Sequence, residues 1–275
     1  MRLLPSLAKS TANAMTIHEI RDELAKGKAT VGTWLQIPSA DVAELMARAG
    51  YDWVACDMEH GSFGPSILPD IFRAIEVGGA VPFARLPIAE KTRIKAALEA
   101  GAHGLIFPMI ESADQLREAI DLATYPGQDS WRDAGQTAHE YRGVGYCRAN
   151  CFGKAFDSYR AKITPEIFIV AQIEHIRALE QLDGILAHPR LDAIMVGPYD
   201  LSGSMGLTGE FEHADFKEAM ARIRKACQRR NVPMGLHIVQ PNPSELSDEI
   251  SRGTRFIAYG IDSVFLWKSA ERPKV

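Results

Sequence analysis

Two acidic residues, Glu174 and Asp200, each end a run of strand-forming residues, and the two runs are one βα unit apart. The first run is Ile-Phe-Ile-Val-Ala-Gln-Ile before Glu174, and the second is Leu-Asp-Ala-Ile-Met-Val-Gly-Pro-Tyr before Asp200. In a parallel barrel, consecutive strands bring their C-terminal ends to one rim, where active sites are built. Two carboxylates at that rim can hold a divalent cation and leave positions open for substrate oxygens. The spacing therefore predicts a metal site formed by Glu174 and Asp200.

A histidine and an arginine follow two earlier apolar runs. His60, in Asp57-Met-Glu-His60, can serve as a general base near neutral pH, and the alternative is a surface-loop histidine. Asp57 and Glu59 are candidates for holding a metal-bound water or for orienting loops. Arg85 ends Val81-Pro-Phe-Ala-Arg85, and its planar guanidinium suits a carboxylate or a developing enolate oxygen. The alternative for Arg85 is a structural ion pair with Glu59 or Glu99.

Further polar residues at strand ends are candidates for substrate contacts. Gln172 and Glu174 point to the same side of a strand because strand side chains alternate. The turn Gly197-Pro-Tyr-Asp200 precedes a helix expected to begin around Asp200, and free N–H groups there favour an anion such as a substrate carboxylate. Asp200 could instead be a plain N-cap with Ser202 behind it. His237 ends a later apolar run and is a candidate for lining the pocket.

The elements that position these residues alternate along the chain. Helical spacing of apolar residues separates short Val/Ile/Leu-rich runs, and a pattern of eight strands in 275 residues predicts a (β/α)8 TIM barrel, typically ~250 residues long. A helix over 15–27 is expected to close the barrel floor, and the connection 125–160 is long enough to overhang the rim. The expected strands are 31–36, 52–57, 81–85, 104–108, 167–172, 192–197, 233–238 and 255–259.

The composition narrows the class of protein. With 46% hydrophobic residues and a net charge of −4, the chain can bury a core and gives no electrostatic reason to expect a nucleic acid or anionic membrane partner. No apolar run approaches the ~18 residues of a membrane span.

Residues 1–14 are expected to be a disordered extension rather than a signal peptide, because Pro5 and Lys9 interrupt the apolar stretch. Residues 15–275 are expected to form one barrel domain. The four cysteines show no CxxC pair, so a reducing cytoplasm is expected.

Six motifs occur in a fixed order along the chain. They are Asp57-Met-Glu-His60, Ala84-Arg85, Gly101-Ala-His-Gly-Leu-Ile-Phe-Pro-Met109, Arg142-Gly-Val-Gly145, Gln172-Ile-Glu174 and Gly197-Pro-Tyr-Asp-Leu-Ser202. Together they resemble the HpcH/HpaI family of metal-dependent (class II) pyruvate aldolases. The resemblance covers about 30–270 and implies the phosphoenolpyruvate/pyruvate type of TIM barrel.

The resemblance implies roles for individual residues. Glu174 and Asp200 would hold Mg, Mn or Co, with His60 as the base and Arg85 on the keto oxygen. Gln172 and the backbone around Pro198 and Tyr199 would contact pyruvate. Family members pair the histidine with a carboxylate on the helix after the third strand, where this chain has Glu99 in place of the frequent aspartate. The family is typically hexameric, with the last helix exchanged between subunits. The 127–140 insertion departs from shorter relatives.

The expected reaction is reversible aldol cleavage of a 2-keto-4-hydroxy acid to pyruvate and an aldehyde through a metal-stabilised enolate. A Schiff-base route is disfavoured because the lysines in the body of the chain fall on helices or in the insertion. The first alternative is an enzyme like citrate synthase or citrate lyase that condenses an enolate with a keto acid. The second is a non-catalytic barrel that binds sugar acids.

Overall fold

Eight parallel strands form a closed barrel, as predicted. The computed structural model describes residues 14–128, 141–270 and 272. Each strand pairs with its neighbour in the chain, and pairing of β1 with β8 closes the ring. Every predicted strand is present, with ends within two residues of those expected. The strands are β1 (Thr30–Leu35), β2 (Trp53–Asp57), β3 (Val81–Arg85), β4 (Gly104–Phe107), β5 (Phe168–Ile173), β6 (Ala193–Val196), β7 (Met234–Ile238) and β8 (Phe256–Ile261).

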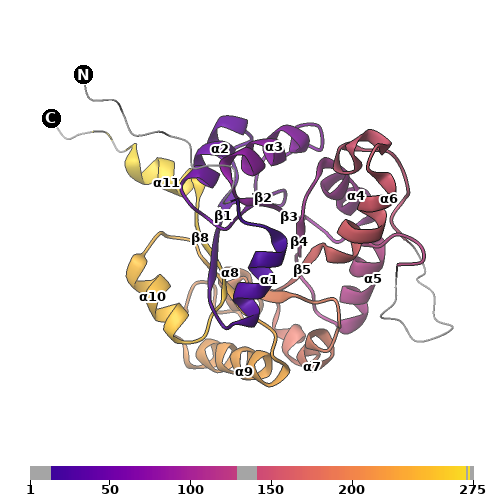
Figure 1. Ribbon diagram of the computed structural model, residues 1–275. Helices are drawn as coiled ribbons and strands as arrows, with labels where there is room; N and C mark the ends of the chain where they lie inside the picture. Colours follow the sequence, from indigo (N-terminus) through magenta and orange to yellow (C-terminus); the bar gives the residue numbers. More distant parts are fainter. Residues whose placement is uncertain (1–13, 129–140, 271, 273–275) are drawn as a thin grey trace.

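Helices surround the barrel, as Figure 1 shows. Most of them are amphipathic, and their buried apolar side chains pack with the outward side chains of the strands in one hydrophobic layer. None of the described helices is long and apolar enough to cross a membrane. The helices are α1 (Ile17–Ala25), α2 (Ala40–Arg48), α3 (Leu68–Gly78), α4 (Lys91–Ala100), α5 (Ala113–Ala123), α6 (Phe156–Ser158), α7 (Leu182–Leu186), α8 (Pro198–Ser204), α9 (Ala214–Arg230), α10 (Pro243–Ser251) and α11 (Asp262–Ser269).

The barrel interior is filled by a second hydrophobic cluster that is rich in aromatic rings. Trp53 stacks on Phe256 with ring centroids 4.4 Å apart, and both side chains are fully buried. Gly32 on β1 makes room for this packing, because a Cβ there would lie 2.0 Å from the Trp53 ring. The interior is therefore a packed core and not a channel.

The N-terminal end of the barrel is closed by α1 (Ile17–Ala25), as predicted for 15–27. Thr16 and Glu19 form a capping box that starts this helix. Its buried side chains join the interior aromatic cluster, and Figure 1 shows α1 at the centre of the ring of helices. Arg21 is anchored to Asp192, whose carboxylate oxygen lies 2.7 Å from Nε. With the floor covered, the C-terminal rim is the end where a substrate could enter.

The connection between α5 and β5 is long, and only part of it is described. It contains the 3₁₀ turns Arg148–Gly153 and Thr164–Glu166, the short helix α6 and a π turn at Tyr159–Ile163. Most of the predicted 127–140 insertion lies outside the described residues, as does the predicted extension 1–14 apart from Ala14. The extent of the domain stays a prediction.

Candidate active site

Arg85 is held rigidly at the rim by Asp57. The two residues end neighbouring strands β3 and β2 and stand in register. Nε and Nη2 of Arg85 donate to Oδ1 and Oδ2 of Asp57 over 2.9 and 2.6 Å, and both side chains are buried. The guanidinium also lies over the Trp34 ring, with Cζ 4.6 Å from the ring centroid. The remaining nitrogen, Nη1, lies 3.5 Å from Oε2 of Glu59. The sequence alternative of an ion pair with Glu59 is thus realised, and Asp57 is the principal partner.

Asp57 also orders the turn that carries the predicted base. Its Oδ1 accepts hydrogen bonds from the backbone N–H groups of Glu59 and His60 over 3.2 and 3.1 Å. Its Oδ2 accepts another from Nε2 of Gln36 over 2.9 Å. Burial opposes ionisation of this carboxyl, but the hydrogen bonds and charge of Arg85 lower its pKa overall. Asp57 accepts bonds from five donors, so of its two predicted roles the geometry favours orienting the loop.

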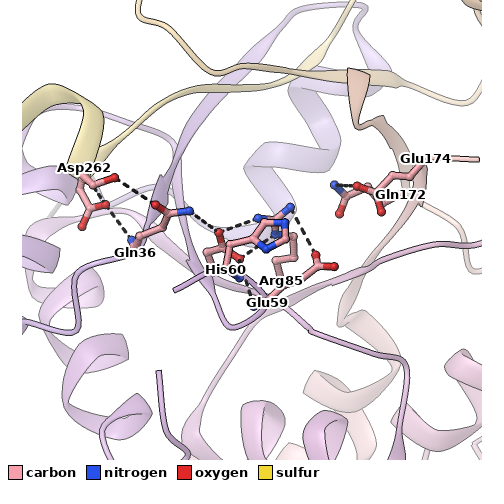
Figure 2. A network of polar contacts seen from close by, with 9 residues as sticks. Gln36, Glu59, His60, Arg85, Gln172, Glu174 and Asp262 are labelled. Atoms are coloured by element: carbon pink, nitrogen blue, oxygen red, sulfur yellow. Dashed lines mark hydrogen bonds and ion pairs between the residues drawn. The ribbon is translucent and has the colours of Figure 1, made fainter. Parts of the chain in front are cut away.

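Glu174 lies across the rim, in a pocket that its neighbours build around its carboxylate. Oε1 accepts from Nε2 of Gln172 over 2.7 Å, and Oε2 accepts from the backbone N–H of Met109 over 3.1 Å. Gly197, at the end of β6, closes the pocket: a Cβ there would lie 2.4 Å from Oε1 of Glu174. Figure 2 shows Gln172 and Glu174 side by side, apart from the Arg85 group.

The pKa of Glu174 is shifted by burial and, to a smaller extent, by neighbouring charges. Burial raises its pKa to about 7, and the negative charges of Glu59 and Asp200 add to this effect. The Met109 N–H and the Arg85 charge oppose it. Burial also raises the pKa of Glu59, with further contributions from the charges of Asp57 and Asp200. Three carboxylates therefore interact electrostatically at this rim, and a bound cation would relieve their repulsion.

Asp200 lies in the first turn of α8, which starts earlier than expected. The helix begins at Pro198 rather than around Asp200, because the fixed φ of proline suits the first helical position. Gly197 is the N-cap and makes no side-chain cap. The alternative of Asp200 as a plain N-cap is therefore wrong. The Asp200 side chain is exposed, and Tyr199 packs edge-on against Phe211, with ring centroids 5.0 Å apart.

Several buried polar atoms around the rim make no hydrogen bond in the part of the chain that is described. They come from four elements, and they are Nε1 of Trp34, Oε2 of Glu59, Oε1 of Gln172 and Nε2 of His237. Buried polar groups are nearly always satisfied by protein or by water. Their clustering beside Arg85 and Glu174 marks the place where a ligand or ordered waters would complete the bonding.

His237 contributes one of these atoms and is uncharged at neutral pH. Burial lowers its pKa to about 3, with a further contribution from the charge of Arg85. Its ring meets Trp34 edge-on, with centroids 5.5 Å apart. A neutral imidazole against an indole gives the pocket an apolar wall with one polar atom available.

His60 and Glu99 are less closely joined to this group. His60 is exposed on the turn after β2, and its charge acts on Glu59. Glu99 lies on α4 with Oε1 3.9 Å from Nζ of Lys95, and it lines a separate cavity with Pro65. No hydrogen bond or ion pair described for these two side chains connects His60 with Glu99. The role of Glu99 stays a prediction.

The structure thus brings most of the predicted residues together and adds others. Sequence reasoning missed Gln36, Asp262, Trp34 and Met109. Gln36 and Met109 each follow a strand closely, and that position was the available signal. The predicted residues at the rim are Arg85, Gln172, Glu174, Gly197, Pro198, Tyr199, Asp200 and His237, with His60 on the adjoining turn.

A metal at this rim would have few protein ligands. Within residues 14–128, 141–270 and 272 no group of three or more His, Cys, Asp or Glu side chains is arranged to hold an ion. Two carboxylates remain, Glu174 in its tight pocket and the exposed Asp200. Two acidic ligands leave most positions open for water or substrate oxygens, as Mg²⁺ sites commonly do.

Known proteins share both the sequence and the fold. A hydroxypyruvate/pyruvate aldolase of Paraburkholderia phytofirmans is 33% identical over 92% of this chain and 95% of its own. A 2-keto-3-deoxy-L-rhamnonate aldolase of Klebsiella pneumoniae is 29% identical over 94% of this chain and 93% of its own. A Burkholderia cenocepacia protein of known structure superimposes with a TM-score of 0.82 at 31% identity, covering 91% of this chain and 95% of that one.

The family assignment follows from a match along most of the chain. The sequence profile of the HpcH/HpaI aldolase/citrate lyase family matches residues 30–268, a span that includes all eight strands and every rim residue described above. The predicted family is therefore confirmed: this chain belongs to the HpcH/HpaI aldolase/citrate lyase family.

Proposed function

We propose that this protein is a metal-dependent pyruvate aldolase. It would reversibly cleave a 2-keto-4-hydroxy acid to pyruvate and an aldehyde. The observation that carries the proposal is the pairing at one rim of a locked guanidinium, Arg85, with an acidic pocket at Glu174 and Asp200. The names of the two aldolases compared above agree with this activity.

Glu174 and Asp200 are the residues that would hold the metal, with Mg, Mn or Co as candidates. The fit rests on the elevated pKa of Glu174 beside two other acids and on the Gly197 pocket that fixes its carboxylate. When bound, the ion supplies Lewis-acid polarisation of the keto group.

The chain's own residues bind and orient the keto acid. Nη1 of Arg85 is the guanidinium nitrogen not used by Asp57, so it can donate to the keto oxygen and to the enolate oxygen that replaces it. Oε1 of Gln172 has no hydrogen-bond partner among the described residues. The backbone at Pro198 and Tyr199 lies at a helix start that suits the substrate carboxylate. His237 lines the pocket in its neutral form.

His60 moves the proton. It removes the proton of the C4 hydroxyl, the C3–C4 bond breaks, and its electron pair enters the pyruvate enolate while C4 becomes the aldehyde carbonyl. The proton that His60 removed is then returned, directly or through water, to C3 of the enolate and completes pyruvate. Glu99 would assist His60, and E99Q tests this: a fall in kcat with unchanged metal affinity is expected.

The decisive experiment measures turnover with and without metal. The purified protein is stripped with EDTA, reloaded separately with Mg²⁺, Mn²⁺ or Co²⁺, and incubated with pyruvate and short hydroxyaldehydes, with oxaloacetate in a second series. Metal-dependent formation of the 2-keto-4-hydroxy acid is the expected result, and E174A and D200A should abolish it. Inactivity with every metal would leave the non-catalytic barrel as the better explanation. Condensation of an acyl-CoA with a keto acid would favour the citrate-synthase-like alternative.

Assembly and location are proposed with this function. The homohexamer implied by the family suits α11, where Leu266 and Trp267 are 59% and 72% exposed. Light scattering coupled to gel filtration measures the mass, and W267E should lower it if this helix is covered in the assembly. Small keto acids and aldehydes are the proposed partners, in a cytoplasmic location.

A further inference from the structure

A chain of hydrogen bonds extends from the Asp57–Arg85 pair to the start of the C-terminal helix α11. Nε2 of Gln36 donates to Asp57, and Oε1 of Gln36 accepts from Oγ of Ser263 over 3.1 Å. Asp262 accepts hydrogen bonds from the backbone N–H groups of Gln36 and Ile37 over 2.8 and 2.9 Å. Figure 2 shows this chain running from Asp262 through Gln36 to Arg85.

These hydrogen bonds fix both the position and the orientation of the Gln36 amide. Asp262, buried at 3% exposure, ties down the backbone of Gln36. The ionised Asp57 carboxylate can only accept, so the nitrogen end of the Gln36 amide faces Asp57, and the oxygen end accepts from Oγ of Ser263. Hydrogen bonds to buried charges are stronger than those at the surface. The Gln36 amide that donates to Asp57 is therefore held at both its backbone and its side-chain oxygen.

We propose that Gln36, supported by Ser263 and Asp262, is a positioning residue that acts on Arg85 through Asp57. The Gln36 bond holds the plane of the Asp57 carboxylate, which accepts from Nε and Nη2 of Arg85. Nη1 makes no bond to Asp57 and lies 3.5 Å from Oε2 of Glu59. The geometry of Arg85 thereby depends on how α11 is seated against β1. The catalytic consequence rests on the proposed aldolase function, whereas the effect on Arg85 itself does not.

The kinetic test is a double-mutant cycle. Q36M keeps the side-chain length and removes the amide, and D57N weakens the acceptor. Q36M should lower kcat roughly tenfold with little change in KM for the keto acid, because one hydrogen bond to a buried charge is lost. In the D57N background Q36M should add little, since both changes act on the same contact. Additive effects would overturn the proposal.

Two further variants keep the test interpretable. S263A frees the amide without altering Gln36 and should lower kcat roughly threefold. If Q36M fails to fold, S263A tests the same hydrogen bonds in its place. S39A is the matched control: Ser39 caps α2 from the same loop, with Oγ 3.4 Å from the Val42 nitrogen, and has no part in the chain to Arg85. S39A should leave kcat unchanged.

A second readout needs neither metal nor substrate. In protein labelled with ¹⁵N-arginine, the Nε–H signal of Arg85 is identified by its absence in R85K. This proton should exchange slowly with solvent in wild type and S39A, and at least tenfold faster in Q36M. Exchange in Q36M equal to wild type would overturn the proposal. Faster exchange in an enzyme that lacks aldolase activity would support the positioning role and count only against the proposed function.

Discussion

The substitution Gly197→Ala should displace the Glu174 carboxylate and thereby weaken metal binding and turnover. The backbone of Gly197 has φ −94° and ψ 97°, which alanine adopts without strain. The added Cβ would lie 2.4 Å from Oε1 and 2.8 Å from Cγ of Glu174. To regain an ordinary contact of about 3.4 Å, the carboxylate must move by about 1 Å.

The magnitude follows from what that shift breaks. It strains the bonds that Glu174 accepts from Gln172 and Met109, and a buried group that loses a partner costs ~1–3 kcal/mol. In a chain of this size that lowers Tm by roughly 2–10 °C. Metal–oxygen distances tolerate only ~0.2 Å, so metal affinity should fall at least tenfold. A misplacement of ~1 Å at a reacting centre costs ~100-fold in kcat/KM.

Three measurements on G197A check this reasoning. They are the Kd for Mn²⁺ by titration calorimetry, kcat/KM at saturating metal, and Tm without metal. Gly203→Ala is the matched control, because it lies on the same helix and its Cβ would sit 3.4 Å from Oγ1 of Thr208. G203A should stay within twofold of wild type. A G197A protein with wild-type Kd and turnover would refute the assignment of Glu174 as a metal ligand in this pocket.

Three more predictions concern Arg85, the partly buried His237 and the metal. Arg85→Lys should lower kcat ~100-fold while Mn²⁺ affinity holds, because an ammonium cannot span both Asp57 oxygens; near-normal kcat would contradict this. His237 has a pKa of about 3 when folded against 6.5 when exposed, so the unfolded chain takes up the proton first and stability falls below pH 6.5. Between pH 8 and pH 5 this protonation lowers the free energy of unfolding by about 2 kcal/mol. Urea titrations at the two pH values should show that loss in wild type and not in H237Q. An equal loss in both proteins would argue against the assignment. A metal ion present at ~100 times its Kd should raise the free energy of unfolding by ~2.7 kcal/mol, and removing the ion should reverse this rise. The E174A variant should show no rise in its free energy of unfolding when the metal is added back.

The strand pattern and the rim were predictable because both follow from short-range rules. Runs such as Val81–Arg85 are apolar on both faces, which is typical of barrel strands covered by helices. Parallel strands then carry Arg85, Glu174 and Gly197 to the same end without further information.

The contacts between these residues were less predictable. The sequence suggested Glu59 or Glu99 as an ion-pair partner of Arg85, whereas the in-register pairing of β2 with β3 makes Asp57 the principal partner. Gln36 and Asp262 lie 226 positions apart in contact, a pairing that only closure of the barrel creates. The start of α8 was misplaced because Asp200 gave a capping signal, whereas Pro198 fixes the first turn.

The rim consists of two polar groups that share no hydrogen bond among the described residues. Strands β8 and β1 to β3 build the guanidinium side, and β4 to β6 build the carboxylate side around Glu174. The two sides interact through the charges of Arg85, Glu59 and Glu174, and a molecule bound between them would contact both. In the proposed enzyme, substitutions on the guanidinium side would therefore alter the binding of the enolate oxygen without breaking a hydrogen bond of the carboxylate side, and the reverse holds for substitutions around Glu174.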